Sequence, residues 1–403
     1  MKHGASSVLK VGCILLAVLF LFYALSLLPL PVQAQTVTAT IPVGTAPIGV
    51  AITPNGENAY VTNNEDNTVS VINTATNTVT ATIPGFNYPL GVAVTPNGAY
   101  AYVTNDVFND GSVSVINTAT NTVTATITGF NDPTAVAVTP DGAYAYVTNS
   151  NGYANDSVSV INTATNTITA AISLSNPTGV AVTPNGAYAY VVNDGRGVSV
   201  INTTTNTITA NVIGFSTDYS YGVAITPDGA YAYVANSGGS SVSVISTATN
   251  TVTTTISTYF GPNIFGAESA PHDVAVTPNG AYAYATNVAT GTVSVISTAT
   301  NTITTNITVG GEPNGVAITP NGEYVYVTNL DSNTVSVIST SNAITSPTPN
   351  PTVSPTSSST PTVPEFPLLT IPLLLIMIAV FGLLVYIKKR KLAFHGLIER
   401  QAT

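Results

Sequence analysis

Lysine is missing from most of this 403-residue chain, and positive charge is scarce there altogether. Between Gln35 and Asn342 there is no Lys and one Arg, Arg196, against 16 acidic residues, so this central section carries a net charge of −15. Binding to a phosphate backbone requires Lys and Arg side chains. The composition therefore argues against nucleic acid as a partner.

Cysteine and histidine are almost as rare. The only Cys, Cys13, lies in an apolar N-terminal segment, so the central fold uses neither disulfides nor a Cys-based metal site. The central section has one His, which excludes a three-His metal site, and a hydrolase triad needs a His or Lys base. We expect no catalytic residues, no metal site and no cofactor. His272 beside Asp273, with Glu268 nearby, is the one group capable of acid–base chemistry, and we interpret it as loop structure.

Long hydrophobic runs occur only at the two ends. Residues 1–34 combine Lys2 and Lys10, an apolar stretch from Val11 to Leu30 and a small-residue site before Gln35, which is typical of a secretory signal peptide. The apolar stretch is longer than usual, so an uncleaved signal anchor is the alternative. Residues 368–387 are apolar and long enough for one transmembrane helix, and basic residues follow at once in the tail 388–403. Because basic residues mark the cytoplasmic side, the central section is predicted to lie on the cell surface.

Residues 343–367 are rich in Ser, Thr and Pro and predict an extended stalk, either O-glycosylated or plain. Three sequons in the central section offer N-glycosylation at Asn155, Asn202 and Asn306, some of which would arise by chance in a chain this rich in Asn and Thr.

What the central section does have is one phrase repeated seven times. The Pro of "TPNG" or "TPDG" recurs at 54, 96, 140, 184, 227, 278 and 320, spacings of 42 to 51 residues that are typical of a propeller. In one unit, strands are expected at Gly91–Val94, Ala99–Thr104, Ser112–Asn117 and Thr122–Ile127, separated by turn sequences. Each strand has one apolar face, and packing against neighbouring sheets would bury it.

The two ends of the array predict how the ring closes. The last unit lacks a fourth strand before the stalk, and the missing phrase "TVTATI" stands at Thr36–Ile41, ahead of the first unit. We therefore predict an all-β seven-bladed β-propeller over residues 35–342, closed by its N-terminal strand, plus a C-terminal transmembrane helix. Closure also covers an edge strand that would otherwise invite aggregation.

"YVTN" occurs at 60–63, 102–105, 146–149 and 326–329, with variants elsewhere. This repeat resembles the YVTN-type β-propeller family of archaeal and bacterial cell-surface proteins, including surface-layer-like proteins of archaea. The motif Pro364, Glu365, Phe366 and Pro367, with the apolar span and basic cluster, resembles the sorting signal read by archaeosortase-type enzymes. The match is partial because residues 392–403 follow the basic cluster. A plain membrane anchor is the alternative.

The loops after the second and fourth strands vary between units and should share one face of the disc. They hold all six Phe of the central section and several Tyr, and clustered exposed aromatics mark binding surfaces. The candidate binding residues are Phe86, Tyr88, Phe108, Tyr153, Phe215, Tyr219, Tyr221, Tyr259, Phe260 and Phe265. The alternative is that these rings fold inward and plug the mouth of the ring.

Acidic loops at 63–67, 105–110, 193–197 and 329–333 could bind Ca²⁺ through oxygen ligands, although Asn, Asp and Gly are also ordinary turn residues. The function expected from these observations is a non-catalytic binding or adhesion scaffold at the cell surface, with envelope proteins or glycans as partners. A purely structural envelope tile and a lactonase-like propeller hydrolase are the alternatives.

Overall fold

The computed structural model describes residues 35–150, 156–195, 197–214, 220–259 and 269–340. The chain separates into two units, 1–344 and 345–403, and every described residue lies in the first. The signal segment, the stalk, the sorting motif and the proposed membrane span lie outside the described residues. Within those residues, no helix is long and apolar enough to cross a membrane.

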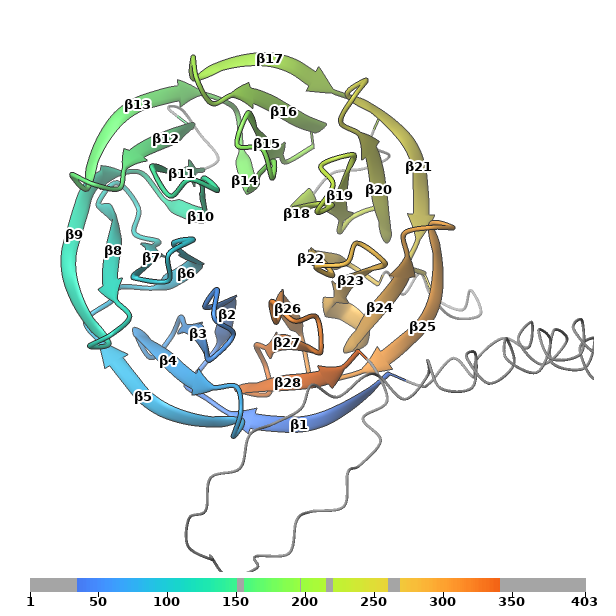
Figure 1. Cartoon of the computed structure of the whole chain (residues 1–403), viewed down its shortest axis with the longest axis horizontal. Coiled ribbons are helices and arrows are strands. Elements are labelled where there is room, and N and C mark those ends of the chain that lie inside the picture. The colour runs from blue at the N-terminus through green and yellow to red at the C-terminus, as the bar shows by residue number, and fades with distance from the viewer. Residues whose placement is uncertain (1–34, 151–155, 196, 215–219, 260–268, 341–403) are drawn as a thin grey trace, which may run out of the picture. The chain divides into compact units, whose positions relative to one another are not determined.

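Seven four-stranded antiparallel sheets surround a central opening (Figure 1). Blade 1 consists of β2 (Pro47–Ile52), β3 (Asn58–Asn63), β4 (Thr68–Asn73) and β5 (Thr78–Pro84). Blade 2 consists of β6 (Pro89–Val94), β7 (Tyr100–Asn105), β8 (Gly111–Asn117) and β9 (Thr122–Phe130). Blade 3 consists of β10 (Pro133–Val138), β11 (Tyr144–Asn149), β12 (Ser157–Asn162) and β13 (Thr167–Ser173). Blade 4 consists of β14 (Pro177–Val182), β15 (Tyr188–Asn193), β16 (Gly197–Asn202) and β17 (Thr207–Val212).

Blade 5 consists of β18 (Ser220–Ile225), β19 (Tyr231–Asn236), β20 (Ser241–Ser246) and β21 (Thr251–Ser257). Blade 6 consists of β22 (Pro271–Val276), β23 (Tyr282–Asn287), β24 (Thr292–Ser297) and β25 (Thr302–Thr308), with a short 3₁₀ turn, η1 (Val288–Thr290). Blade 7 consists of β26 (Pro313–Ile318), β27 (Tyr324–Asn329), β28 (Thr334–Ser339) and β1 (Thr36–Pro42).

The N-terminal strand completes blade 7, as the sequence predicted. β1 pairs antiparallel with β28, with Thr36 opposite Ser339 and Pro42 opposite Thr334. The end of this pair formed by Thr36 and Ser339 lies on the side of the disc that carries the "TPNG" and "TATN" turns. The loops that vary lie on the opposite side, because they follow the second and fourth strands.

Each letter of the YVTN motif has a structural role. The Val is buried between blades, for example Val61 and Val103. The Asn ties strands within a blade: Asn63 Nδ2 donates to Ser70 Oγ at 2.9 Å. The Thr ties one blade to the next: Thr62 Oγ1 donates to the carbonyl of Leu90 at 2.7 Å. The repeated motif therefore produces the same contacts within blades and between neighbouring blades around the ring.

The Tyr of the motif joins the outer parts of neighbouring blades. Tyr60 Oη donates to Asn121 Oδ1 at 2.7 Å, and Asn121 has a left-handed φ of 52° in the "TATN" turn of blade 2. Five more buried tyrosines make the same bond to the next blade, namely Tyr102, Tyr146, Tyr190, Tyr233 and Tyr326. The seventh, Tyr284, faces blade 7, where the outermost strand is β1 and the described residues include no "TATN" turn after β28. Its hydroxyl is buried and has no hydrogen-bond partner among the described residues, and burial, with a smaller contribution from Tyr282, raises its pKa.

Candidate functional site

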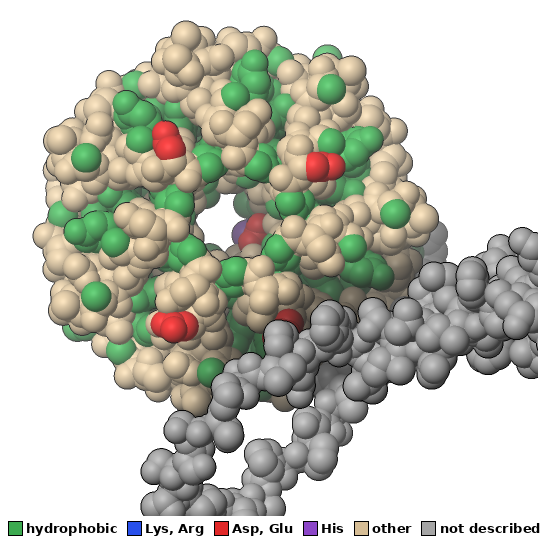
Figure 2. Space-filling model, in the orientation of Figure 1, with side chains coloured by type: hydrophobic (Ala, Val, Ile, Leu, Met, Phe, Trp, Pro, Cys, Tyr) green, Lys and Arg blue, Asp and Glu red, His purple; other side chains and the backbone are tan. Residues whose placement is uncertain are grey.

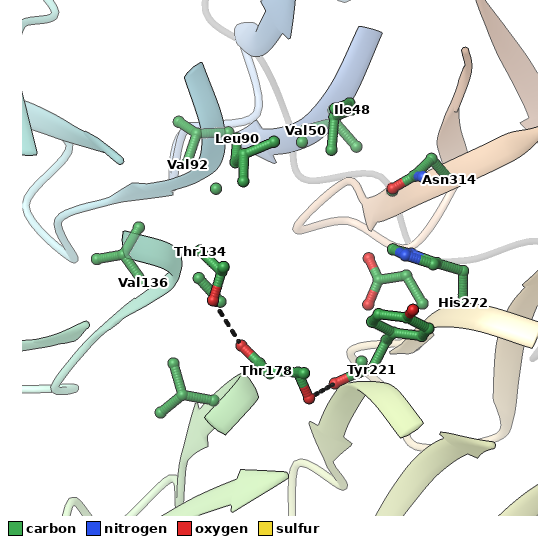
Figure 3. Close-up of a pocket in the computed structure, with 18 of the residues that line it drawn as sticks. Ile48, Val50, Leu90, Val92, Thr134, Val136, Thr178, Tyr221, His272 and Asn314 are labelled. Atoms are coloured by element: carbon green, nitrogen blue, oxygen red, sulfur yellow. Dashed lines mark hydrogen bonds between the residues drawn. The ribbon is translucent and has the colours of Figure 1, made fainter. Parts of the chain in front are cut away.

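The innermost strands share a bulge near their first residues. In β2, Pro47 is opposite Asn63 but Val50 is opposite Val61, so one extra residue is inserted between them, and all seven innermost strands show the same shift. Bulges re-aim side chains and are common next to binding sites. Here the bulge directs the second residue of each innermost strand toward the central opening (Figure 3).

These seven second positions form what we call the channel ring, and they are the most varied part of the innermost strands. The ring consists of Ile48, Leu90, Thr134, Thr178, Tyr221, His272 and Asn314. Two residues further along, every blade has Val followed by Ala. The repeated structure therefore surrounds one set of positions that holds six different residue types in seven blades, with Thr occurring twice.

The third position of each innermost strand is small in six blades: Gly49, Gly91, Ala135, Gly179, Gly222 and Gly315. The reason is the next blade. A Cβ added to Gly49 would lie 2.4 Å from the carbonyl oxygen of Leu90, and one added to Gly179 would lie 2.1 Å from that of Tyr221. Blade 6 departs from this rule, because Asp273 occupies the position. A carboxylate has thus been placed where the repeat otherwise has almost no side chain.

Asp273 is held by backbone amides on two blades. Its Oδ1 accepts from the amide of Val274 at 2.8 Å and its Oδ2 from the amide of Val316, on β26, at 3.0 Å. Part of the Asp273 side chain is exposed to the channel, but the surrounding blades exclude most of the solvent from it. Burial raises the pKa of this carboxyl to about 6, and the two amide hydrogen bonds oppose the rise.

His272 is stacked on Tyr221 of the neighbouring blade, with ring centroids 4.3 Å apart and an interplanar angle of 22°. Burial lowers the pKa of the imidazole to about 4, so it is neutral at pH 7. Among the described residues, no hydrogen bond joins His272 to Asp273, and Glu268 lies outside them. The interpretation of this pair as loop structure was wrong, because both residues lie on strand β22. They are neighbours in the sequence, but no hydrogen bond is present between them through which a proton could be transferred.

The ring and the residues beside it enclose a cavity of about 380 Å³, within the range of small-molecule sites, about 300–1,000 Å³. Figure 3 shows Ile48, Val50, Leu90 and Val92 along one stretch of its wall, while Tyr221, His272 and Asn314 follow one another along another. Thr134 and Thr178 lie between the two. Figure 2 shows acidic and histidine atoms at the wall of the opening, and no Lys or Arg on that face.

Negative charge also gathers on the variable-loop side of blades 2 and 3. Burial raises the pKa of Asp106 to about 6, with a further contribution from Asp132. The pKa of Asp132 is raised by burial and then by Asp156. Each carboxylate therefore acts on the next, and the potential on this side is negative.

The loop aromatics expected to form the binding face are divided by the structure. Tyr88 and Phe108 are 52% and 61% exposed, whereas Phe86 is buried in the core between blades 1 and 2. Tyr259 is half-buried. Tyr221 lies on β18 and belongs to the channel ring. Tyr153, Phe215, Tyr219, Phe260 and Phe265 lie outside the described residues.

The sequons differ in the same way. The Nδ2 of Asn306 is buried and without a hydrogen-bond partner, while its Oδ1 accepts from Ser294 at 2.7 Å. Asn202 is half-buried at the start of a turn, where its Oδ1 accepts from the amides of Thr204 and Thr205. Asn155 lies outside the described residues.

Three of the loop oxygens considered as Ca²⁺ ligands accept hydrogen bonds from backbone amides, whereas the buried Asn193 Oδ1 has no hydrogen-bond partner among the described residues. Asn63 Oδ1 accepts from Gly44, Asp66 Oδ2 from Thr45 and Asn333 Oδ1 from Ala46. Within the described parts of the chain, no group of three or more His, Cys, Asp or Glu side chains could hold a metal ion.

Comparison with known proteins supports the architecture. A family model described as "Lactonase, 7-bladed beta-propeller" matches residues 157–300 and, overlapping, 222–355. The chain is similar to lactonase-type seven-bladed propellers. The overlap is what a repeated sequence produces when a model aligns in two registers. Among curated proteins, none matches this chain. Kuenenia stuttgartiensis hydrazine synthase has a similar structure, with a TM-score of 0.67 and 23% identity over 74% of this chain and 97% of that one, a likeness of fold alone.

Proposed function

We propose that this protein is a cell-surface propeller that binds an envelope protein or glycan, without catalysis, through the side of the disc that carries the variable loops. The observation that carries the proposal is where the sequence varies. The turns on one side are nearly identical in every blade, while the loops and the channel ring on the other side differ from blade to blade. A structural tile would need no such individuality on one side alone.

The geometry of the chain ends supports this orientation. Thr36 and Ser339 lie opposite each other on the side of the invariant turns. An anchor after residue 340 would leave the disc on that side, and the variable side would face away from the point of attachment. The cell-surface location, with an archaeosortase-type signal or a plain anchor, is inferred from the terminal sequences.

The exposed rings on the variable side provide the test. Tyr88 and Phe108 would be changed together to Ser in the purified full-length protein, and binding to separate polysaccharide and protein fractions of the cell envelope would be measured. The matched control changes Tyr100 and Tyr144, which are 39% and 37% exposed beside the invariant turns. We expect saturable binding that is lost with the first pair and kept with the second. Equal binding by all three proteins, or none, would favour the structural tile.

A lactonase-like hydrolase is the second candidate, favoured by the family-model match and by the neutral His272 in the channel. An imidazole that is neutral at pH 7 can act as a base. Hydrolysis of a lactone panel that is lost on changing His272 to Thr, the residue of the ring in blade 4, would support this candidate. The same result would contradict the proposal that the protein acts without catalysis.

A further inference from the structure

Asp273 is a largely buried charge, and the described residues provide no counter-charge for it. The described residues contain no Lys and no Arg, and the imidazole beside it is neutral at pH 7 because its pKa is about 4. Burying a carboxylate without a cationic partner is costly. The six other blades avoid this cost with Gly or Ala at the same position. A costly group in a cavity, at a position where the fold itself prefers a small residue, calls for a role in binding.

The carboxylate retains capacity for a ligand. A carboxylate offers about four lone-pair positions, and the amides of Val274 and Val316 each use one, on different oxygens. These two bonds fix the orientation of the group, so a ligand would meet a carboxylate that is already positioned. Preorganisation of this kind lowers the cost of binding.

The rest of the cavity wall indicates what would be attached to the positive group. Aromatic faces attract cations, and the stacked rings of Tyr221 and His272 lie beside Asp273 on the neighbouring positions of the ring. Further round the cavity wall, Ile48, Leu90 and Val92 offer an aliphatic surface. Anionic ligands have no positive group to meet here, and the −15 charge of the central section repels them.

We propose that the central cavity binds a small organic cation, with its ammonium group against Asp273 and Tyr221 and its apolar body against the aliphatic wall. A divalent metal ion fits less well. Ca²⁺ takes about six to eight oxygen ligands, whereas this wall supplies a single carboxylate. The site is independent of the macromolecular partner proposed above, because it uses the channel rather than the exposed loop rings.

The test compares a cation with its uncharged counterpart. Choline and 3,3-dimethyl-1-butanol have nearly the same shape, but only choline is charged. Each would be titrated calorimetrically into the full-length protein at pH 8, with butylammonium as a second cation and CaCl₂ as the metal. We expect saturable binding of at least one of the two cations. We also expect choline to bind at least tenfold more tightly than the alcohol.

Two variants decide whether Asp273 is responsible. Asp273→Gly restores the residue that most other blades have, and Asp273→Asn keeps the side-chain volume in case the first variant is unstable. Asp228→Asn is the charge-matched control, because Asp228 lies in an exposed "TPDG" turn that is "TPNG" in other blades. We expect both Asp273 variants to lose at least tenfold in affinity for the cation, and the control to lose nothing.

The affinity should also depend on pH. Four strands, β18, β19, β23 and β26, pack against β22. The titratable groups that line the channel with Asp273 are His272 on β22 and Tyr221 on β18, and β26 contributes none. The remaining titratable groups on these strands are tyrosines outside the channel lining, namely Tyr231 and Tyr233 on β19 and Tyr282 and Tyr284 on β23. Because the carboxyl has a pKa of about 6, protonation below pH 6 should weaken cation binding by up to about tenfold per pH unit. Equal binding of choline and the alcohol, unchanged affinity in both Asp273 variants, binding of Ca²⁺ alone, or no binding of either cation would each overturn the proposal.

Discussion

Replacing Asp273 with Gly should make the propeller more stable relative to wild type at neutral pH than at acidic pH, although the change removes an interior side chain. The carboxyl pKa rises from its ordinary value of 3.8 to about 6 on folding. Below pH 3.8 the group is protonated in both the folded and unfolded states and has no pH-dependent effect. As the pH rises, the unfolded state ionises first, so the free energy of unfolding falls. Above pH 6 the loss is complete.

The size of the loss follows from the shift. Each pKa unit corresponds to about 1.4 kcal/mol, so the change from 3.8 to about 6 corresponds to about 3 kcal/mol of destabilisation above pH 7. The glycine substitution adds a backbone-entropy cost of up to about 1 kcal/mol and leaves the amides of Val274 and Val316 without this acceptor. Both of these costs are independent of pH, so the pH dependence isolates the carboxylate.

Urea unfolding followed by tyrosine fluorescence provides the assay, since the chain contains no Trp. Between pH 3.5 and pH 8, the difference in unfolding free energy between the two proteins should shift by about 3 kcal/mol in favour of the variant. For roughly 300 residues this corresponds to about 5 °C in Tm. Asp228→Asn should shift the difference in the opposite direction, because hydrogen bonds from Thr226 and the Ala230 amide lower the pKa of Asp228, so its carboxylate stabilises the fold as the pH rises. The same pH dependence in wild type and in Asp273→Gly would refute the reasoning, because it would mean that the carboxyl is solvated and titrates near 4.

Three further results are expected. His272→Thr should remove a loss of about 3 kcal/mol in unfolding free energy that wild type shows on acidification. The loss arises because the imidazole pKa is lowered from 6.5 to about 4, so the unfolded state binds a proton first as the pH falls from 6.5 to 4. Urea midpoints at pH 7 and pH 4 would measure it, and the same loss in the variant would contradict the prediction. Tyr102→Phe should destabilise by about 1–2 kcal/mol, because it removes a buried hydroxyl that donates to Asn166 at 2.7 Å; a variant as stable as wild type would show that this joint contributes little. If the protein is N-glycosylated after folding, peptide mass spectrometry should find sugar on Asn202 and none on Asn306, whose amide nitrogen is buried; a sugar on Asn306 would place modification before folding.

The fold was predictable from the sequence because the same pattern of strand and turn residues occurs in seven repeats. Alternation, turn residues and the displaced "TVTATI" phrase predicted the blades and the closing strand, and β1 lies against β28 as expected. The strand starts were less accurate: the first strand of blade 2 was expected from Gly91, but it begins at Pro89. Those two residues matter, because Leu90 belongs to the channel ring.

Most residues of the candidate site could not be predicted from a single repeat. His272 and Tyr221 attracted notice as rare or aromatic residues, but the other ring members look like ordinary loop residues when each repeat is read by itself. The bulge that turns them inward is a property of strand pairing and has no signature in one copy. Aligning the seven copies would have exposed the ring, since the residue after the first Pro varies while the Val-Ala pair after it is constant. Phe86 and Tyr88 show the same limit, because two neighbouring aromatics have opposite exposures of 8% and 52%.

The pairing of Thr36 with Ser339 has a mechanical consequence. Because both strands leave the disc at this one point, a force that separates the two ends would act on the first pair alone and would then open the β1–β28 ladder pair by pair. The remaining six blades would carry no tension until β1 had been removed. The force needed to separate the two chain ends is therefore set by the successive opening of this one strand pair, and the rigidity of the disc does not raise it. If the N-terminal segment is cleaved and free, no tension reaches this ladder at all.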